Sequence, residues 1–214
     1  MKKGIIFKEK IKSWGREILE HKYLIIISIL FLIISVSLDI LAGNYADKKA
    51  SMPVTDIILD NIPVINLSFI FSYGILLILI MGLIYTLFFK VGGLHIVLSQ
   101  FSLLVLIRSF FVTLTHLKRP AEAFANAYLS HVPRIFTFEN DLFFSGHVAI
   151  PFLGFLLYRK EKIGIFFLIM TFVMAFTVLA MHVHYSIDVF AAVFITYGSY
   201  KIGQKLFREL NYYN

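Results

Sequence analysis

The sequence predicts an all-α polytopic membrane protein with about six transmembrane helices and with both termini in the cytoplasm. Of its 214 residues, 59% are hydrophobic and only 15% are charged, and its mean hydropathy of +0.82 is far above that of a soluble domain. Apolar runs long enough to cross a hydrocarbon core of about 30 Å recur along the chain. These runs do not alternate apolar and polar residues, so they favour helices.

The expected helices are delimited by charged residues, glycines and prolines between the apolar runs. Pro151 is the proline that does not lie at such a boundary. It falls about one turn into the fourth run, where a proline is tolerated. Hydropathy places the helices at Tyr23–Leu41, Ile65–Phe89, Leu94–His116, Leu142–Tyr158, Ile163–Met181 and Ile187–Gly203.

Two regions are expected along the chain. Residues 1–22 are basic and carry spaced apolar side chains, which predicts an amphipathic segment at the membrane interface. The apolar run after it begins too late and is too long for a cleaved signal peptide. Residues 23–214 leave no room for a separate soluble domain, so we expect one six-helix transmembrane domain that carries any catalysis.

Positive charge gathers on one side of the predicted bundle. It lies in residues 1–22, at Lys90, in residues 159–162 and in the tail after Lys201. The positive-inside rule assigns this side to the cytoplasm. The same distribution accounts for the net charge of +7 without a nucleic-acid partner. The composition, rich in Ile, Lys, Phe and Asn, favours a bacterial plasma membrane.

Two polar segments are predicted to meet at the outer membrane level. One ends in Ser145-Gly146-His147, and the other contains His184 and Asp188. Because His184 and Asp188 are four residues apart at a helix start, the carboxylate can bind one imidazole nitrogen. The other nitrogen is then free to act as a nucleophile or base.

His147 begins the fourth predicted helix, directly after Ser145 and Gly146. The free backbone N–H groups of a helix start favour a phosphate, and glycine permits its close approach. The pattern therefore predicts a phosphate site beside an activated histidine.

Other interpretations of these residues stay open. A histidine within the membrane can simply bind a neighbouring helix, and a His/Asp pair can be a structural link or half of a metal site that also uses Asp141. An ionisable residue at membrane depth costs free energy, which favours a functional role over a purely structural one. The chain has no cysteine and no His-Glu-x-x-His spacing, so we expect neither a metal nor another cofactor.

Ser145-Gly146-His147 together with His184-x-x-x-Asp188 resembles the membrane branch of the type 2 phosphatidic acid phosphatase superfamily. Within it the details are similar to the sphingomyelin synthases. Their late motif matches residues 184–189, and their middle motif places an aspartate before Ser-Gly-His, as Asp141 does here. Their arginine followed seven residues later by threonine corresponds to Arg108 and Thr115.

The chain also departs from related patterns. The phosphatase members have basic residues where Val112 and Val178 stand here, although Arg119-Pro120 remains. Asn140 stands where the sphingomyelin synthases have glycine, which leaves the choice of headgroup open.

The resemblance implies a role for each candidate residue. His184 would attack the phosphorus of a phospholipid, Asp188 would stabilise the imidazolium, and His147 would protonate the departing alkoxide. Asp141 would orient His147, and Glu122 is either a further carboxylate of this relay or a solvated loop acid. Arg108 would bind the phosphoryl oxygens or pair with an aspartate of the bundle, Asp39 or Asp56. The expected phosphate-binding residues are Arg108, Ser145, Gly146 and Tyr185.

The main functional hypothesis is transfer of a phospho-headgroup from a phospholipid donor to the hydroxyl of a lipid acceptor, ceramide or diacylglycerol, at the outer membrane face. The alternative is a lipid phosphate phosphatase of the same superfamily, in which water is the acceptor. A transporter or helical scaffold is the non-enzymatic alternative, but no inverted repeat supports it.

Overall fold

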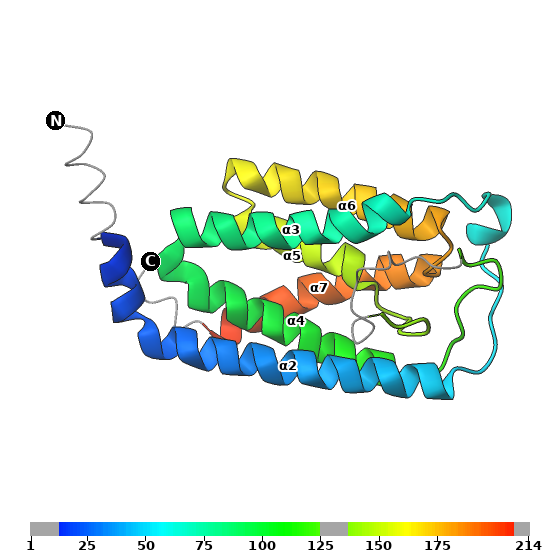
Figure 1. The fold of residues 1–214 in the computed structure, drawn as a ribbon, viewed down its shortest axis with the longest axis horizontal. Helices are drawn as coiled ribbons and strands as arrows, with labels where there is room; N and C mark the ends of the chain where they lie inside the picture. Colours follow the sequence, from blue (N-terminus) through cyan, green and yellow to red (C-terminus); the bar gives the residue numbers. More distant parts are fainter. Residues whose placement is uncertain (1–12, 125–136, 208–214) are drawn as a thin grey trace.

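The computed structural model describes residues 13–124 and 137–207, and across these residues the chain is helical and has no strand (Figure 1). A short helical stretch over residues 13–20 precedes six long helices and two single 3₁₀ turns. The all-α prediction is therefore confirmed. The helices are α2 (Lys22–Lys49), α3 (Ser68–Phe89), α4 (Leu94–Leu114), α5 (Gly146–Tyr158), α6 (Lys162–Ala180) and α7 (Ser186–Leu206).

Four of these segments are long and apolar enough to cross a membrane: α2, α3, α6, and α4 together with the 3₁₀ turn before it. The chain is thus an integral membrane protein. Helix α5 has 13 residues, which span only about 20 Å, and α7 does not meet the same criteria. That α5 and α7 also cross the membrane, and that both termini are cytoplasmic, stay predictions.

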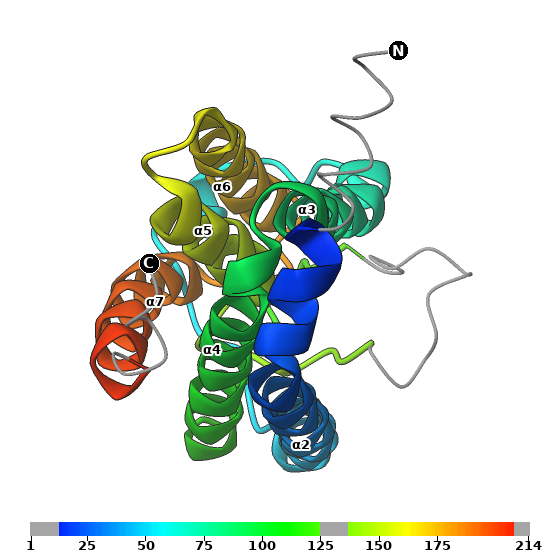
Figure 2. The same ribbon diagram turned by 90° about the vertical axis from the view of Figure 1, so that its left-hand side faces the viewer.

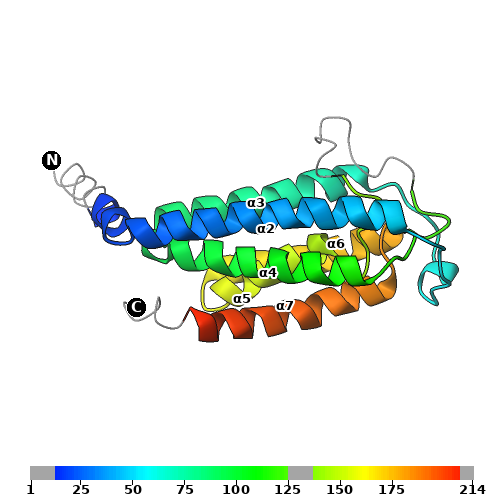
Figure 3. The same cartoon turned by 90° about the horizontal axis from the view of Figure 1, so that it is seen from below.

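The bundle has two different ends. The tight turns between α3 and α4 and between α5 and α6 lie at one end, which we call the turn end (Figure 1). The longer connections lie at the other end, which we call the loop end; their described residues are 50–67, 115–124, 137–145 and 181–185 (Figure 3). Of the predicted segment 1–22, residues 1–12 lie outside the described residues. At the turn end the indole Nε1 of Trp14 donates to the carbonyl of Leu87 at 2.7 Å.

Small side chains let α2 pack against α4 (Figure 2). The buried residues of α2 form a stripe along one side of the helix, and small residues at such positions let two helix backbones approach closely in a membrane. Ser28 adds hydrogen bonds to the hydroxyl of Ser99 and the carbonyl of His95, both at 2.9 Å. The stripe consists of Ser28, Ser35, Ala42, Gly43 and Ala46.

Helix α5 packs against both α6 and α7 and anchors the main apolar core. Val148 and Leu153 of α5 are buried with Phe144, Val178 and Ala192. This packing holds the first turn of α5 close to the start of α7, so that residues distant in sequence meet at the loop end.

Two helix boundaries differ clearly from the sequence prediction, while the others agree to within about three residues. The first helix runs to Lys49, not Leu41, and its extension carries Asp47, whose carboxylate accepts the backbone N–H groups of Glu139 and Asn140 at 3.1 and 2.7 Å. The fourth helix begins at Gly146, not Leu142, because Phe143 has φ of 78°, which a right-handed helix excludes.

Candidate active site

The imidazole Nδ1 of His184 lies 3.1 Å from Oδ2 of Asp188, as the four-residue spacing predicted. Helix α7 begins between these two residues, and Asp188 belongs to its first turn. The same carboxylate oxygen accepts the backbone N–H of Tyr185 at 3.0 Å, so it also caps the helix. With Nδ1 held by Asp188, Nε2 is the nitrogen of His184 that is left for chemistry.

The other oxygen of Asp188 joins α7 to the segment before α5. Oδ1 accepts the backbone N–H of Phe143 at 3.0 Å, and Asp188 is 0% exposed. This bond holds Phe143 in its left-handed conformation, which carries a strain of about 1–2 kcal/mol. Asp188 therefore sets both the orientation of His184 and the path of the chain into Ser145-Gly146-His147.

His147 lies on the first turn of α5, and its ring stacks on Phe71 of α3 with 3.9 Å between the ring centroids. His147 and His184 line one cavity of about 380 Å³ near the loop end. The structure thus brings together the two histidines that the sequence singled out, one from α5 and the other from the turn before α7. Residues of α2, α3, α4 and α5, with Phe138 and Asp141 of the segment before α5, form the remaining walls.

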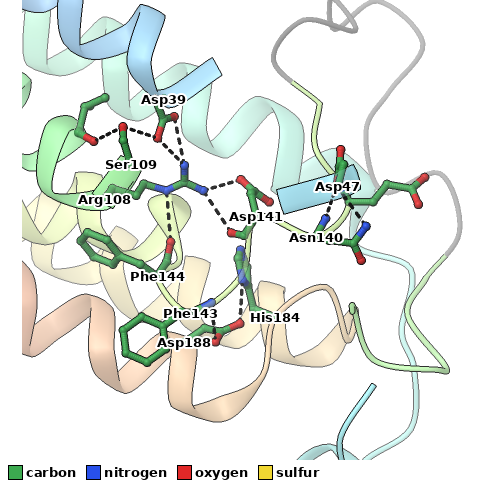
Figure 4. A network of polar contacts seen from close by, with 12 residues as sticks. Asp39, Asp47, Arg108, Ser109, Asn140, Asp141, Phe143, Phe144, His184 and Asp188 are labelled. Carbon is green, nitrogen blue, oxygen red and sulfur yellow. Dashed lines mark hydrogen bonds and ion pairs between the residues drawn. The ribbon is translucent and has the colours of Figure 1, made fainter. Parts of the chain in front are cut away.

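Arg108 of α4 lies at the centre of a polar network beside this cavity (Figure 4). Its Nη1 donates to both oxygens of Asp39 at 2.8 and 3.0 Å, and its Nη2 donates to the carboxylate and, at 3.4 Å, the carbonyl of Asp141. Its Nε donates to the carbonyl of Phe144 at 3.2 Å. Each nitrogen of the guanidinium therefore already has at least one acceptor. A phosphate that binds Arg108 must share a guanidinium nitrogen with these partners or displace one of them.

Asp39 is a site residue that the predicted set left out, although it was named as a partner for Arg108. It lies on the long apolar helix α2, where an ionisable side chain is a signal in itself. Asp141, expected to orient His147, instead binds Arg108 and lines the cavity. With one guanidinium between two carboxylates, the carboxylate and guanidinium groups of the lining have a formal charge of −1, not counting the two histidines.

The start of α5 lines the cavity. Gly146 and His147 are its first two residues, and within the described part of the chain no acceptor is assigned to their N–H groups. A Cβ on Gly146 would lie 3.3 Å from Nε of Arg108, so glycine leaves room beside the guanidinium. Ser145 precedes the helix, but its buried hydroxyl does not line the cavity and has no partner among the described residues.

Two other predicted site residues lie elsewhere. The hydroxyl of Tyr185 donates to the carbonyl of Lys118 at 2.8 Å and accepts the N–H of Val54 at 3.0 Å, so it binds the loops rather than the cavity. Burial raises the pKa of this hydroxyl above 10.0. Glu122 lines a separate cavity at the loop end, together with Tyr185.

Asp56 links the 51–67 loop to the start of α7. Its carboxylate accepts the N–H of Ser186 at 2.7 Å and those of Ile58 and Leu59 at 2.9 and 3.2 Å. Burial by itself raises the pKa of Asp56, but these N–H donors outweigh it and bring the pKa below 3.8.

The fold and the site define a helical membrane protein with a buried His–Asp pair and a second histidine around one cavity, an arrangement suited to nucleophilic chemistry on a phosphate. Residues 140–205, which contain both histidines, match the family described as PAP2 superfamily C-terminal. The match supports the type 2 phosphatidic acid phosphatase superfamily and an enzyme of the phosphatase or phosphotransferase type that acts on membrane lipids. A comparison with curated proteins gave no match.

Proposed function

We propose that the protein transfers a phospho-headgroup from a phospholipid to a lipid hydroxyl, as the sphingomyelin synthases do, through a phosphohistidine at the outer membrane face. The observation that carries the proposal is the shared cavity of His147 and His184, in which Asp188 binds Nδ1 of His184 at 3.1 Å.

In the first half-reaction, Nε2 of His184 attacks the phosphorus, and the bond from phosphorus to the diacylglycerol oxygen breaks. His147 gives its proton to the departing alkoxide, while Asp188 stabilises the positive charge on His184. In the second half-reaction, His147 takes the proton of the acceptor hydroxyl. The hydroxyl oxygen attacks the phosphorus, and the bond to Nε2 breaks. His184 and His147 are then back in their starting forms.

The walls around the cavity support lipid substrates. An apolar groove of about 240 Å³ continues from the cavity toward the turn end, and Leu79, Phe101 and Ile150 line both spaces. The groove is lined almost entirely by hydrophobic side chains, so it can bury part of an acyl chain. Since α2 packs mainly on α4, and α3 on α5 and α6, the cavity lies between these two groups of helices.

The charge of the cavity supports a phosphodiester donor with a cationic headgroup, such as phosphocholine or phosphoethanolamine lipid. Arg108 already binds Asp39 and Asp141, so no net positive charge is left for a phosphate dianion. A zwitterionic donor adds no net charge, whereas phosphatidic acid brings up to two negative charges next to two carboxylates. This difference favours transfer over hydrolysis of a phosphate monoester.

The distribution of charge supports a loop end that faces outward. The described turn end carries Lys90, Arg159, Lys160 and Lys162, whereas at the described loop end Lys48, Lys49, Lys118 and Arg119 are outnumbered by the acidic residues Asp47, Asp56, Asp60, Glu122, Glu139 and Asp141. By the positive-inside rule the turn end is cytoplasmic, and the cavity then opens on the outer side of a plasma membrane.

The test is an assay in detergent micelles with fluorescent ceramide and fluorescent diacylglycerol as acceptors and a panel of phospholipid donors. Labelled phospholipid and free phosphate are both measured. We expect a labelled phospholipid with the wild-type protein and none with His184→Ala. The matched control is His116→Ala, which removes an exposed loop-end histidine and should leave turnover unchanged. Free phosphate without labelled lipid would establish the phosphatase instead, and turnover by His184→Ala would refute the nucleophile.

A further inference from the structure

A second cavity, of about 400 Å³, lies at the loop end and shares no lining residue with the catalytic cavity. We call it the acidic pocket. Three segments that are distant in sequence enclose it: residues 53–62, residues 120–122 and the turn between α6 and α7. Its lining includes Asp56, Asp60, Glu122 and His182.

All the charged side chains that line the acidic pocket are carboxylates: Asp56, Asp60 and Glu122. Both oxygens of Asp56 already accept backbone N–H groups, so this carboxylate is part of the framework. Asp60 and Glu122 are exposed, and within the described residues no hydrogen bond or ion pair is assigned to either side chain. Two carboxylates are therefore left to bind a cation.

His182 supplies the observation that points to a ligand. Its side chain lines the pocket and is only 2% exposed, and its Nε2 has no hydrogen-bond partner in the described part of the chain. Leaving a buried polar atom without a partner is unfavourable, so this nitrogen, as the acceptor of an imidazole protonated at Nδ1, calls for a group that can donate a hydrogen bond to it. The backbone at His182 is left-handed, with φ of 52°.

The imidazole and carboxylate groups of the pocket fit an ammonium group better than a metal ion. Among the described residues no group of three or more His, Cys, Asp or Glu side chains is arranged to hold a metal. A primary ammonium carries a positive charge and three N–H donors, which can reach an imidazole nitrogen and two carboxylates that are farther apart. A quaternary ammonium has the charge but no donor, so it cannot satisfy Nε2 of His182.

We propose that the acidic pocket binds a primary ammonium group through His182, Asp60 and Glu122. The ligand is either a soluble amine or the amino headgroup of a phospholipid in the adjacent leaflet, since both present the same group. The binding does not depend on the proposed transfer reaction, because none of the pocket residues lies in the catalytic cavity.

The test is calorimetric titration of the full-length protein in detergent with ethanolamine, choline and ethylene glycol, which differ in donors and in charge. We expect saturable binding of ethanolamine, at least fivefold weaker binding of choline and none of ethylene glycol. The double variant Asp60→Asn/Glu122→Gln should weaken ethanolamine at least tenfold. Glu139→Gln removes an exposed loop-end carboxylate that does not line the pocket, so it should have no effect.

The source of the amine is tested in nanodiscs. If phosphatidylethanolamine weakens the binding of ethanolamine at least fivefold relative to phosphatidylcholine, the pocket takes the lipid headgroup, and equal binding assigns it to a soluble amine. The proposal is overturned if ethanolamine does not bind saturably, if choline binds as well as ethanolamine, or if the double variant binds like the wild type. Because binding is read without turnover, these outcomes are separate from those of the transferase assay.

Discussion

The carboxylate of Asp188 holds His184 by its Nδ1 at 3.1 Å and, through its other oxygen, the backbone N–H of Phe143 at 3.0 Å. One fully buried side chain therefore orients the candidate nucleophile and fixes the chain that leads to His147. Both the reaction and the folding of the chain depend on the carboxylate of Asp188. A variant of Asp188 and a variant of His184 should therefore differ in stability.

Asp188→Asn is expected to lower both activity and stability. An amide has one acceptor oxygen, so its NH₂ group must face either the N–H of Phe143 or the donors at Tyr185 and His184. We expect transfer to fall about 10³–10⁴-fold, as when a carboxylate that orients a catalytic histidine is replaced by an amide. The free energy of unfolding should fall by about 1–3 kcal/mol. Product formation and thermal unfolding in the same detergent measure the two effects.

The comparison variant is His184→Asn, which removes the nucleophile but leaves the carboxylate in place. It should be at least as inactive as Asp188→Asn yet unfold at a temperature closer to that of the wild type. If the two variants lose the same stability, Asp188 does not have the structural role assigned to it.

Asp39→Asn is expected to change which lipids the protein accepts. The substitution removes one of the two carboxylates at Arg108 and brings the formal charge of the carboxylate and guanidinium groups of the lining from −1 to zero. An anionic phosphate monoester should then be repelled less. We expect the ratio of kcat/KM for phosphatidic acid to that for a zwitterionic donor to rise about tenfold, as measured with both lipids in the micelle assay.

Asp47→Asn is the matched control for this experiment. It also removes a carboxylate from α2, but that carboxylate binds Glu139 and Asn140 and does not line the cavity. The ratio of kcat/KM for phosphatidic acid to that for a zwitterionic donor should stay at the wild-type value in Asp47→Asn. An unchanged ratio in Asp39→Asn would mean that cavity charge does not select the donor.

Phe143→Gly is expected to be more stable than Phe143→Ala by about 1 kcal/mol, the reverse of the usual order. Both variants lose the ring that stacks on Phe111, so their difference isolates the backbone. Alanine keeps the cost of φ at 78°, whereas glycine adopts this conformation freely. Thermal unfolding of the two proteins side by side measures the difference, and a more stable alanine variant would show that Phe143 is not strained.

Acid should destabilise the wild type more steeply than Asp56→Asn. The pKa of Asp56 lies below 3.8 in the folded protein, so its carboxylate adds stability that is present above the unfolded value of 3.8. This stability is lost as the pH falls through the lower, folded pKa. The thermal midpoint followed from pH 7 down to pH 3 should converge for the two proteins at the acid end. Parallel curves would contradict the role of Asp56 at Ser186.

Several features of the site could be read from the sequence because they depend on local spacing. The His184/Asp188 pair needs only one turn of helix, and the amide donors of Gly146 and His147 need only a helix start. The roles of Arg108 and Asp141 could not be read in this way. Which acceptors surround a guanidinium depends on how α2, α4 and the segment before α5 pack together.

The boundary errors have the same origin. Hydropathy ended the first helix at Leu41 because the apolar run ends there, but the helix continues to Lys49, where Asp47 binds the segment before α5. Hydropathy began the fourth helix at Leu142, but the bond from Phe143 to Asp188 delays its start to Gly146. In both cases a contact between distant residues overrides a local preference.

The sequence by itself determined that this chain is helical and lies in a membrane, because twenty-residue apolar runs have few other ways to satisfy their backbone hydrogen bonds there. It also determined the His–Asp pair, whose geometry follows from helical periodicity. Only the tertiary structure decided that both histidines share one cavity, that two aspartates occupy Arg108, and that Tyr185 and Glu122 line a different pocket. These relationships join segments far apart in the chain, and such contacts are set by helix packing rather than by local sequence.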